Sequence, residues 1–342
     1  MAKKLGRQYS IGIGREASGA RGAPAVPQFW VPLSEAPSIE NQVNLIEDEQ
    51  GYGVIEDSVD IKTGNKWAEG SFLGRLRIKS IGLLLLNIFG TVNTDDDTPI
   101  TGKYTHTFTV EQGNQHPSFT LGIDDPIVGD IAHPLCMLES LEIKAELEEP
   151  IVFTAELQAK QSESLIVTPA FATTPELIFT AKNMRAYFAA TQATLINADP
   201  TNIKSMTIKF LTPVEKDFIL GQEDPNDIHN TIFGATIEIT KAYEDTTFKD
   251  YFEDATGRAM RVRLTSSVAH EKLEIDLNQV KLTDWVKSND LNNLLTETLT
   301  FRANFKLADA KMAQVVLVNT QASYLAEIGG SGLAVKAEIV AP

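Results

Sequence analysis

The chain has 342 residues, of which 43% are hydrophobic and 22% are charged, so wholesale disorder, collagen and a coiled coil are excluded. Its 30 basic residues against 46 acidic ones give a net charge of -16 at pH 7. A chain this acidic is a poor candidate for gripping nucleic acid, because the phosphates must be neutralised by cations. The length favours two domains over one.

The single cysteine, Cys136, excludes an intrachain disulfide framework and a structural zinc site built on thiolates. The longest apolar run, residues 81–89, is about half as long as a membrane-spanning helix. No apolar region or small-residue cleavage site of a secretory signal follows the first lysines. We therefore expect synthesis in the cytoplasm and no membrane partner.

The first 24 residues are rich in glycine and almost purely basic in charge, which predicts a flexible arm. From residue 25 to residue 61 the balance inverts, because no lysine or arginine occurs there and several acids do. Such a switch suggests two different environments. The basic candidates of the arm are Lys3, Lys4, Arg7, Arg15 and Arg21, and the acidic candidates of the next segment are Glu47, Asp48, Glu49, Glu56 and Asp57.

Apolar and polar residues alternate with a period of two along most of the remaining chain, which indicates strands with one buried face. Because every second position is polar, we expect antiparallel sheets with one face in water. The alternating segments are 104–110, 141–147, 153–159, 206–210, 235–239, 260–264, 273–277 and 299–307.

Two segments predict helices. Residues 79–89 are apolar almost all round, which implies burial on more than one side. Residues 245–255 are amphipathic, with Asp245 as the expected N-cap and Gly257 as the expected C-cap glycine.

The order of elements in the first half returns in the second half, which predicts an internal duplication. An opening aromatic strand at 28–33 matches one at 186–191, and Leu141-Glu142-Ile143 is echoed by Leu273-Glu274-Ile275. The predicted fold is therefore dominated by β-structure, with two tandem β-barrel or β-sandwich domains and one flanking helix in each. The predicted parts are an N-terminal arm (1–24), two domains (25–168 and 169–324) and a C-terminal arm (325–342).

The sequence contains only weak candidates for catalytic or ligand-binding motifs. The pattern GxGxxA at residues 12–17 lacks the strand and helix context of a dinucleotide site, so a glycine-rich arm is the better interpretation. The five histidines are scattered, His106 is expected in the core, and Cys136 is expected to be buried. The acidic clusters at 95–97 and 223–227 lack the glycine and distal glutamate of a calcium loop. We predict no catalytic residue, cofactor or metal site.

Several segments in the first 90 residues are similar to the major tail tube proteins of long-tailed bacteriophages. They are Phe29-Trp30-Val31-Pro32, residues 44–54 (NLIEDEQGYGV), Ile55-Glu56-Asp57-Ser58, residues 66–72 (KWAEGSF) and residues 80–86 (SIGLLLL). The resemblance implies a structural protein of the virion tail whose copies form rings that stack into a tube. Its implied partners are other copies of itself and the tape measure, tail tip and tail terminator proteins. Two such domains in one chain imply a trimeric, pseudo-sixfold ring.

In this interpretation phage DNA is a transient cargo that slides past an acidic wall. The acids between Glu47 and Asp57 are expected to face the lumen or the adjacent ring, and the basic arm is expected to dock on them in the next ring. The candidates for subunit packing are Trp67, Phe72, Leu83, Leu84, Leu85 and Leu86. Two alternatives remain, namely a two-domain β-sandwich that binds a receptor or carbohydrate through exposed tryptophans, and an enzyme with a spatially assembled site.

Overall fold

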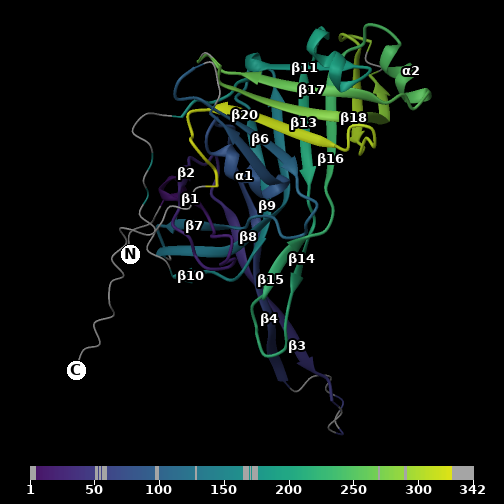
Figure 1. Cartoon of the computed structure of the whole chain (residues 1–342). Coiled ribbons are helices and arrows are strands. Elements are labelled where there is room, and N and C mark those ends of the chain that lie inside the picture. Colours follow the sequence, from purple (N-terminus) through teal and green to yellow (C-terminus); the bar gives the residue numbers. More distant parts are fainter. Residues whose placement is uncertain are drawn as a thin grey trace.

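The computed structural model describes residues 5–50, 53, 55, 60–96, 100–127, 129–164, 169, 171, 176–268, 270–288 and 291–325. The described chain is mostly strand, and every strand pair in it is antiparallel, as the alternation predicts. In Figure 1, strands of the first half of the chain lie next to strands of the second half. The predicted dominance of β-structure is confirmed, but a closed barrel is not formed, because the strands join into one large antiparallel sheet that does not close.

The strands of the first half are β1 (Ser10–Arg15), β2 (Phe29–Val31), β3 (Ser38–Asp48), β4 (Asp60–Arg75), β5 (Gly90–Asp95), β6 (Tyr104–Val110), β7 (Phe119–Asp125), β8 (Gly129–Glu146), β9 (Val152–Ala159) and β10 (Glu163–Ser164). Those of the second half are β11 (Met184–Ala189), β12 (Pro200–Thr201), β13 (Ser205–Leu211), β14 (Val214–Asp217), β15 (Asp227–Asn230), β16 (Gly234–Ala242), β17 (Arg258–Thr265), β18 (Lys272–Lys287), β19 (Thr296–Ala303) and β20 (Ala313–Asn319). Short 3₁₀ turns lie at Gly6–Gln8, Ala181–Asn183 and Gln192–Asn197.

The middle of the sheet is a series of eight strands in the order β3, β4, β9, β8, β13, β16, β19 and β18, which we call the central series. Only the second halves of the long strands β8 and β18 belong to this series. In their first halves, β8 pairs with β7 and β10, and β18 pairs with β17 and β20. The sheet therefore branches at both long strands.

The strand pairing is duplicated. Seven strand pairs of the first half have counterparts in the second half. The correspondences are β1–β2 with β11–β12, β1–β7 with β11–β17, β7–β8 with β17–β18, β8–β9 with β18–β19, β4–β9 with β16–β19, β3–β4 with β13–β16, and β8–β10 with β18–β20. The halves differ by the hairpins β5–β6 and β14–β15. The predicted match between the opening strands 28–33 and 186–191 is wrong. Residues 186–191 overlap β11, which is the counterpart of β1, whereas residues 28–33 contain β2.

Both predicted helices are present, as α1 (Ile81–Phe89) and α2 (Thr247–Glu253). Every residue of α1 is buried, as its uniform apolarity predicts. Gly82 is required there, because a Cβ would lie 2.1 Å from Cζ of the buried Tyr324 ring. The end of α2 differs from the prediction, since the left-handed residue is Ala255 (φ 50°) and not Gly257.

The N-terminal segment is built into the sheet. Strand β1 lies between β2 and β7, with Ile11 and Ile13 fully buried, so the expectation of a flexible arm is wrong for residues 10–15. The glycines that suggested flexibility serve close packing instead. A Cβ on Gly12 would lie 2.4 Å from Cβ of Pro27, and a Cβ on Gly14 would lie 2.3 Å from the carbonyl oxygen of Val26.

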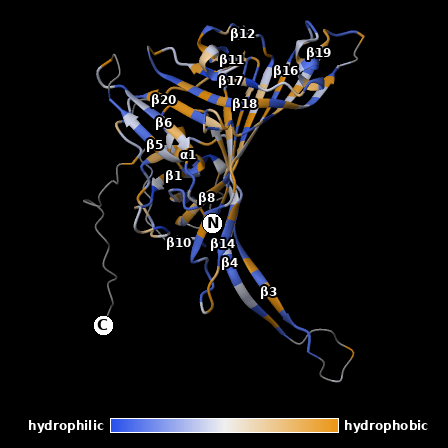
Figure 2. Ribbon diagram, turned by 45° about the vertical axis from the view of Figure 1, so that its right-hand side comes forward, coloured by the Kyte–Doolittle hydropathy of each residue, from blue (hydrophilic) through white to orange (hydrophobic). Residues whose placement is uncertain are grey.

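Hydropathy along the strands follows the predicted alternation, with hydrophilic and hydrophobic residues in turn (Figure 2). His106 and Cys136 are both fully buried, as expected. Burial raises the pKa of the Cys136 thiol, and the nearby Glu16 carboxylate raises it further. That thiol therefore stays protonated and unreactive.

Candidate assembly surfaces

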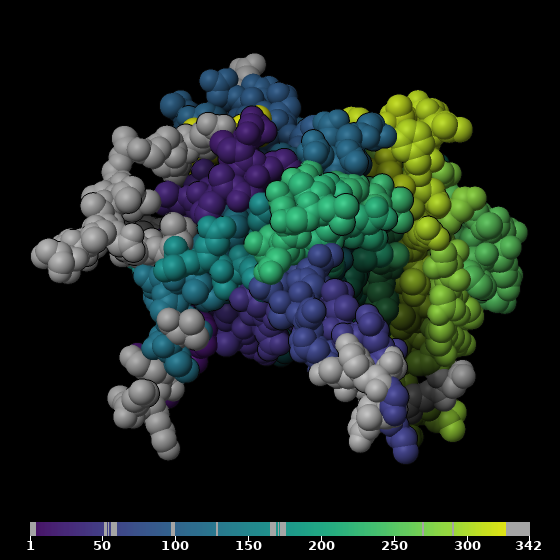
Figure 3. Space-filling model, turned by 90° about the horizontal axis from the view of Figure 1, so that it is seen from below, coloured from purple at the N-terminus to yellow at the C-terminus, as the bar shows by residue number. Residues whose placement is uncertain are grey.

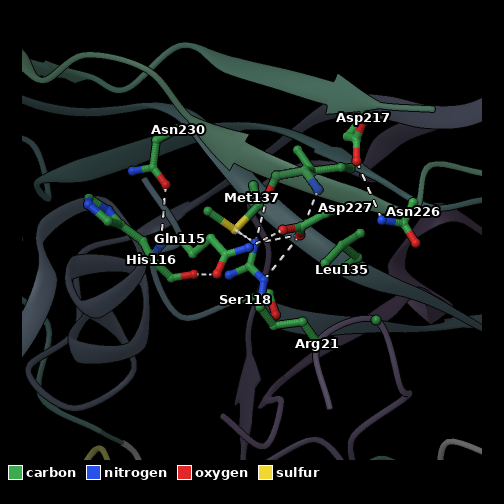
Figure 4. A network of polar contacts seen from close by, with 12 residues as sticks. Arg21, Gln115, His116, Ser118, Leu135, Met137, Asp217, Asn226, Asp227 and Asn230 are labelled. Carbon is green, nitrogen blue, oxygen red and sulfur yellow. Dashed lines mark hydrogen bonds and ion pairs between the residues drawn. The ribbon is translucent and has the colours of Figure 1, made fainter. Parts of the chain in front are cut away.

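Arg21 joins the N-terminal segment to the second half of the chain (Figure 4). Its guanidinium donates to Oδ1 of Asp227 at 2.9 Å and to the carbonyl of Ile228 at 2.6 Å, both on β15, and also to the carbonyl of His116. The side chains of Arg21 and Asp227 are each 17% exposed, so water screens this pair only weakly. Arg21 is thus occupied within the chain.

Glu16 anchors the same segment to the first half. Its buried carboxylate accepts hydrogen bonds from the amides of Gly22 and Leu135, both at 2.7 Å, and from the hydroxyls of Ser118 and Thr120, at 2.5 and 2.9 Å. Four donors around one carboxylate make the negative charge tolerable in the interior. The segment is therefore held in place by polar contacts at both residues.

The other basic candidates are placed differently. Arg15 ends β1 and donates to the carbonyl of Leu325, near the other end of the described chain. Arg7 is exposed in the turn at Gly6–Gln8. Lys3 and Lys4 lie outside the described residues. The candidates thus do not form one patch among the residues that the structure places.

The three described acidic candidates, Glu47, Asp48 and Glu49, lie at the end of β3 in the hairpin β3–β4, which extends away from the body of the molecule (Figure 1). Glu47 and Glu49 are exposed and Asp48 is partly exposed. Glu56 and Asp57 lie outside the described residues. Apolar side chains are exposed beside these acids, since Leu45, Ile46 and Ile61 are 59%, 55% and 56% exposed. A hairpin that exposes both kinds of side chain offers a contact surface.

Trp67 lies where β4 meets the hairpin β14–β15. Its indole N–H donates to Glu69 at 3.0 Å, and Nζ of Lys216 lies 4.6 Å from its ring centroid. The amide of Lys66 donates to the carbonyl of Glu223 at 2.8 Å. Seen from below, β14–β15 lies against segments of the first half (Figure 3). Trp67 thus contacts the other half of its own chain.

The remaining packing candidates are interior residues. Phe72 and the four leucines from Leu83 to Leu86 are at most 3% exposed and belong to the main hydrophobic core. Their burial is complete inside one chain, so they present almost no surface to another copy.

The central series has a polar face opposite the core, which we call the polar face. Its side chains alternate with buried ones along each strand. Acids outnumber bases on it. The acids are Glu40, Glu69, Glu139, Glu142, Glu146, Glu156, Glu238 and Asp284, and the bases are Arg75, Lys144, Lys209, Lys281 and Arg302.

Hydrogen bonds, an ion pair and burial shift the pKa values of two glutamates on the polar face. A hydrogen bond from the Ser140 hydroxyl lowers the pKa of Glu156, and Lys209 at 3.3 Å lowers it further against partial burial. Glu156 therefore stays ionised at neutral pH. Burial raises the pKa of Glu139, and Lys216 opposes that rise. Acidic side chains outnumber basic ones on the polar face, so its formal charge is negative.

The two halves meet in one seam of the sheet. Strand β13 pairs with the second half of β8 from Ser205 opposite Glu146 to Leu211 opposite Ser140. Ile208 and Ile143 face each other in the core, and Lys209 lies opposite Glu142 on the polar face. The seam therefore continues both the core and the charge pattern from one half to the other.

The described ranges contain no cluster of metal ligands. No three histidine, cysteine, aspartate or glutamate residues there are placed to hold a metal ion. Within the same ranges, none of the helices combines the length and the apolarity that crossing a membrane requires.

The family model of the phage tail tube protein matches residues 6–303. The chain belongs to the phage tail tube protein family. It is therefore a structural protein of the virion tail, as the resemblance implied, and not an enzyme. This membership supersedes the alternative of a receptor-binding or carbohydrate-binding module. None of the curated proteins matches the chain.

Sequence reasoning missed the two most informative surfaces of this tail tube protein. The polar face was visible as alternation, for example Glu142 and Lys144 in one strand and Glu156 in the next, but nothing in the sequence says which strands lie side by side. The seam between β8 and β13 was missed for the same reason. The seam joins residues as far apart in the sequence as Ser140 and Leu211, and no local pattern reports such a pairing.

Proposed function

We propose that three copies of this tail tube protein form a ring with pseudo-sixfold symmetry, that rings stack into a tube, and that the polar face lines the conduit for DNA. The duplicated strand pairing carries this proposal. Two sheet units of equal pairing in each chain give six units in a trimer, which is the number that the resemblance implied for rings of single-domain subunits.

The charge of the polar face supports its place in the lumen. A wall that neutralised phosphates would bind DNA through release of counterions, whereas an acidic wall gives no such gain. Glu142, Glu156 and Glu238 lie on three strands of the central series and point to the same side. This surface therefore suits a polyanion that must pass without adhering.

The projecting part of the hairpin β3–β4 is proposed to contact the adjacent ring. Its exposed Leu45, Ile46 and Ile61 would be covered there, and Glu47 and Glu49 would find cationic partners. Replacing Glu47, Asp48 and Glu49 with lysine should impair stacking, as measured by tube length in electron micrographs. Tubes of normal length and full infectivity would contradict this role.

The conduit is tested by reversing charge on the polar face. Glu142→Lys together with Glu238→Lys should make assembled tubes retain short duplex DNA in a salt-dependent manner, while wild-type tubes retain none. The matched control is Glu253→Lys with Asp254→Lys at the end of α2, which packs on the core side of the sheet through Phe248. Equal DNA retention by both variants would overturn the assignment of the lumen.

Ring symmetry is tested by negative-stain electron microscopy over a concentration series, with light-scattering mass on the same samples. Threefold rings and hollow tubes are expected. A compact monomer that persists at high concentration would overturn the proposed assembly.

A further inference from the structure

The hairpin β3–β4 extends past the end of its neighbour β9. Ala68 is the last residue of β4 that pairs with β9, and on β3 the side chain of Asn41 still donates to the hydroxyl of Ser162 at 2.8 Å. Beyond them lies the projecting part, residues 42–48 and 60–67, and in the described chain these two stretches pair only with each other. Because an isolated two-stranded hairpin is at best marginally stable in water, its direction needs support from outside.

The base of the projecting part is a point where the hairpin can bend. Its pairing shifts between Val43 and Leu45, and such an irregularity bends and twists a hairpin locally. From Lys66, opposite Val43, to Asp60 the strand is about 20 Å long at about 3.3 Å per residue. A tilt of about 10° at the base would move the far end by about 3.5 Å, about one residue along a strand. A constant contact with another ring therefore requires that the base is held.

The hairpin β14–β15, by which the two halves differ, has an equivalent in the first half. The hairpin β13–β16 is the counterpart of β3–β4, and β14–β15 lies in the connection between its two strands. Residues 42–48 and 60–67 correspond in length to residues 211–217 and 227–234, and the first and last pairs of the two hairpins match. The hairpin β14–β15 is therefore the projecting part of the second half, separated from its sheet by a break.

Unlike its equivalent, β14–β15 packs against the first half of the chain. Ile228 of β15 is fully buried in a small apolar cluster with Leu135 and Met137 of β8. The guanidinium of Arg21 donates to the carbonyl of Ile228 at 2.6 Å, within the polar network of Figure 4. Apolar and polar contacts thus fix the strands of β14–β15 in place.

The far end of β14–β15 contacts the base of the projecting part. The amide of Lys66 donates to the carbonyl of Glu223 at 2.8 Å, and the two side chains form an ion pair. Nζ of Lys216 on β14 lies 4.6 Å from the ring centroid of Trp67 and donates to Oε1 of Gln158 on β9 at 2.6 Å. Because the amide of Lys66 points away from β3, Glu223 lies on the side of β4 where β9 has ended.

We propose that β14–β15 is a brace that holds the projecting part of β3–β4 in the direction needed to contact the adjacent ring. Lys66, Trp67, Lys216 and Glu223 are its positioning residues, since they join the two hairpins at the base. Of the two equivalent hairpins in each chain, one makes the contact and the other orients it. The inference rests on the contact between rings proposed above.

The test shortens the loop of the brace in the full chain. Replacing residues 218–226 with Asn-Gly removes Glu223, and a two-residue loop of this type suits directly paired residues such as Asp217 and Asp227. In the monomer, hydrogen exchange at the amide of Lys66 should become about tenfold faster, because its acceptor is lost. Rings should still form, but electron micrographs should show a loss of tube length and a variable twist between successive rings.

The matched control changes the same loop and keeps its contact. Ile219→Ser with Leu220→Ser replaces the exposed apolar side chains of the loop and retains Glu223, so its tubes should have the length and twist of wild-type tubes. If these tubes shorten as much as those of the loop-shortened chain, the loop acts by touching the adjacent ring itself, and the inference is overturned.

A second pair of variants decides the question if circular dichroism shows that the loop-shortened chain does not fold. Lys66→Met with Lys216→Met keeps the length of both side chains and removes the ion pair with Glu223 and the cation over Trp67, so tubes should again shorten. Lys66→Arg with Lys216→Arg keeps both charges and should give normal tubes. Equal tube lengths from the two double variants would overturn the brace.

The outcomes separate the inference from the proposed function. Normal tubes from the loop-shortened chain, or unchanged hydrogen exchange at Lys66, would overturn the brace. The proposed contact with the adjacent ring would still stand if replacing Glu47, Asp48 and Glu49 with lysine impairs stacking. If that replacement also leaves the tubes normal, both the contact and its brace fall.

Discussion

Replacing Glu16 with alanine should destabilise the first half of the chain by breaking the carboxylate anchor of the N-terminal segment. The side chain accepts four hydrogen bonds between 2.5 and 2.9 Å. The hydroxyls of Ser118 and Thr120 can rotate toward other acceptors. The amides of Gly22 and Leu135 cannot, and Leu135 is fully buried.

The magnitude follows from those two amides. A buried donor left without a partner costs about 1–3 kcal/mol, and hydrogen bonds to a charged acceptor lie at the upper end. Two stranded amides and a small cavity therefore predict a loss of about 3–5 kcal/mol in the free energy of unfolding. Glu16→Gln keeps the size and one acceptor oxygen, so a loss of about half as much is expected.

The assay is equilibrium unfolding in urea, monitored by circular dichroism at a concentration below that of tube formation. Glu47→Ala serves as the control, because Glu47 is exposed and surface changes usually stay within about 0.5 kcal/mol. A loss below about 1 kcal/mol for Glu16→Ala, or one equal to that of the control, would refute the anchoring role.

Two further predictions concern pH and packing. Burial lowers the pKa of His106, His116 and His133 below 6.5, so the unfolded chain takes up protons below pH 6.5 that the folded chain does not. Stability should then fall as pH drops below 6.5, by up to about 1.4 kcal/mol per pH unit for each histidine. In urea titrations at pH 7.5 and 5.5, His106→Gln should reduce this dependence; a slope equal to that of the wild-type chain would contradict the assignment. Gly82→Ala should displace the Tyr324 ring, whose hydroxyl donates to the carbonyl of Lys79 at 2.6 Å, and so accelerate proteolysis near residue 325. Gly113→Ala, which meets no atom closer than 3.7 Å, is its control, and identical digestion of both would argue against the contact.

The hydropathy pattern of each segment predicted the helices and most strands well, because that pattern reflects which residues of the segment are buried. Residues 81–89 are apolar all round, and every one of them is buried in α1. The alternation at 153–159 became β9, with Phe153, Ala155, Leu157 and Ala159 inward. The strand predicted to 307 ends at Ala303, and Phe305 and Leu307 are exposed.

Features that depend on tertiary neighbours could not be predicted from local patterns. Gly12 and Gly14 contributed to the glycine-rich composition that predicted a flexible arm. In the structure, residues 25–27 lie so close to them that a side chain would not fit at either position. The segment 186–191 was matched by its aromatic residues, whereas its place in the fold is set by its pairing with β17. Arg21 gave no sign in the sequence that its partner is Asp227, more than 200 residues away.

The seam between β8 and β13 would change the kinetics of building the proposed ring. Its two strands are joined by residues 147–204 of the same chain, so they meet at an effective concentration fixed by that tether, whatever the concentration of free subunits. Only the junctions between copies depend on collisions. In the proposed ring of six units, three junctions between copies remain to be formed instead of six, because the other three joints are already closed when each chain has folded.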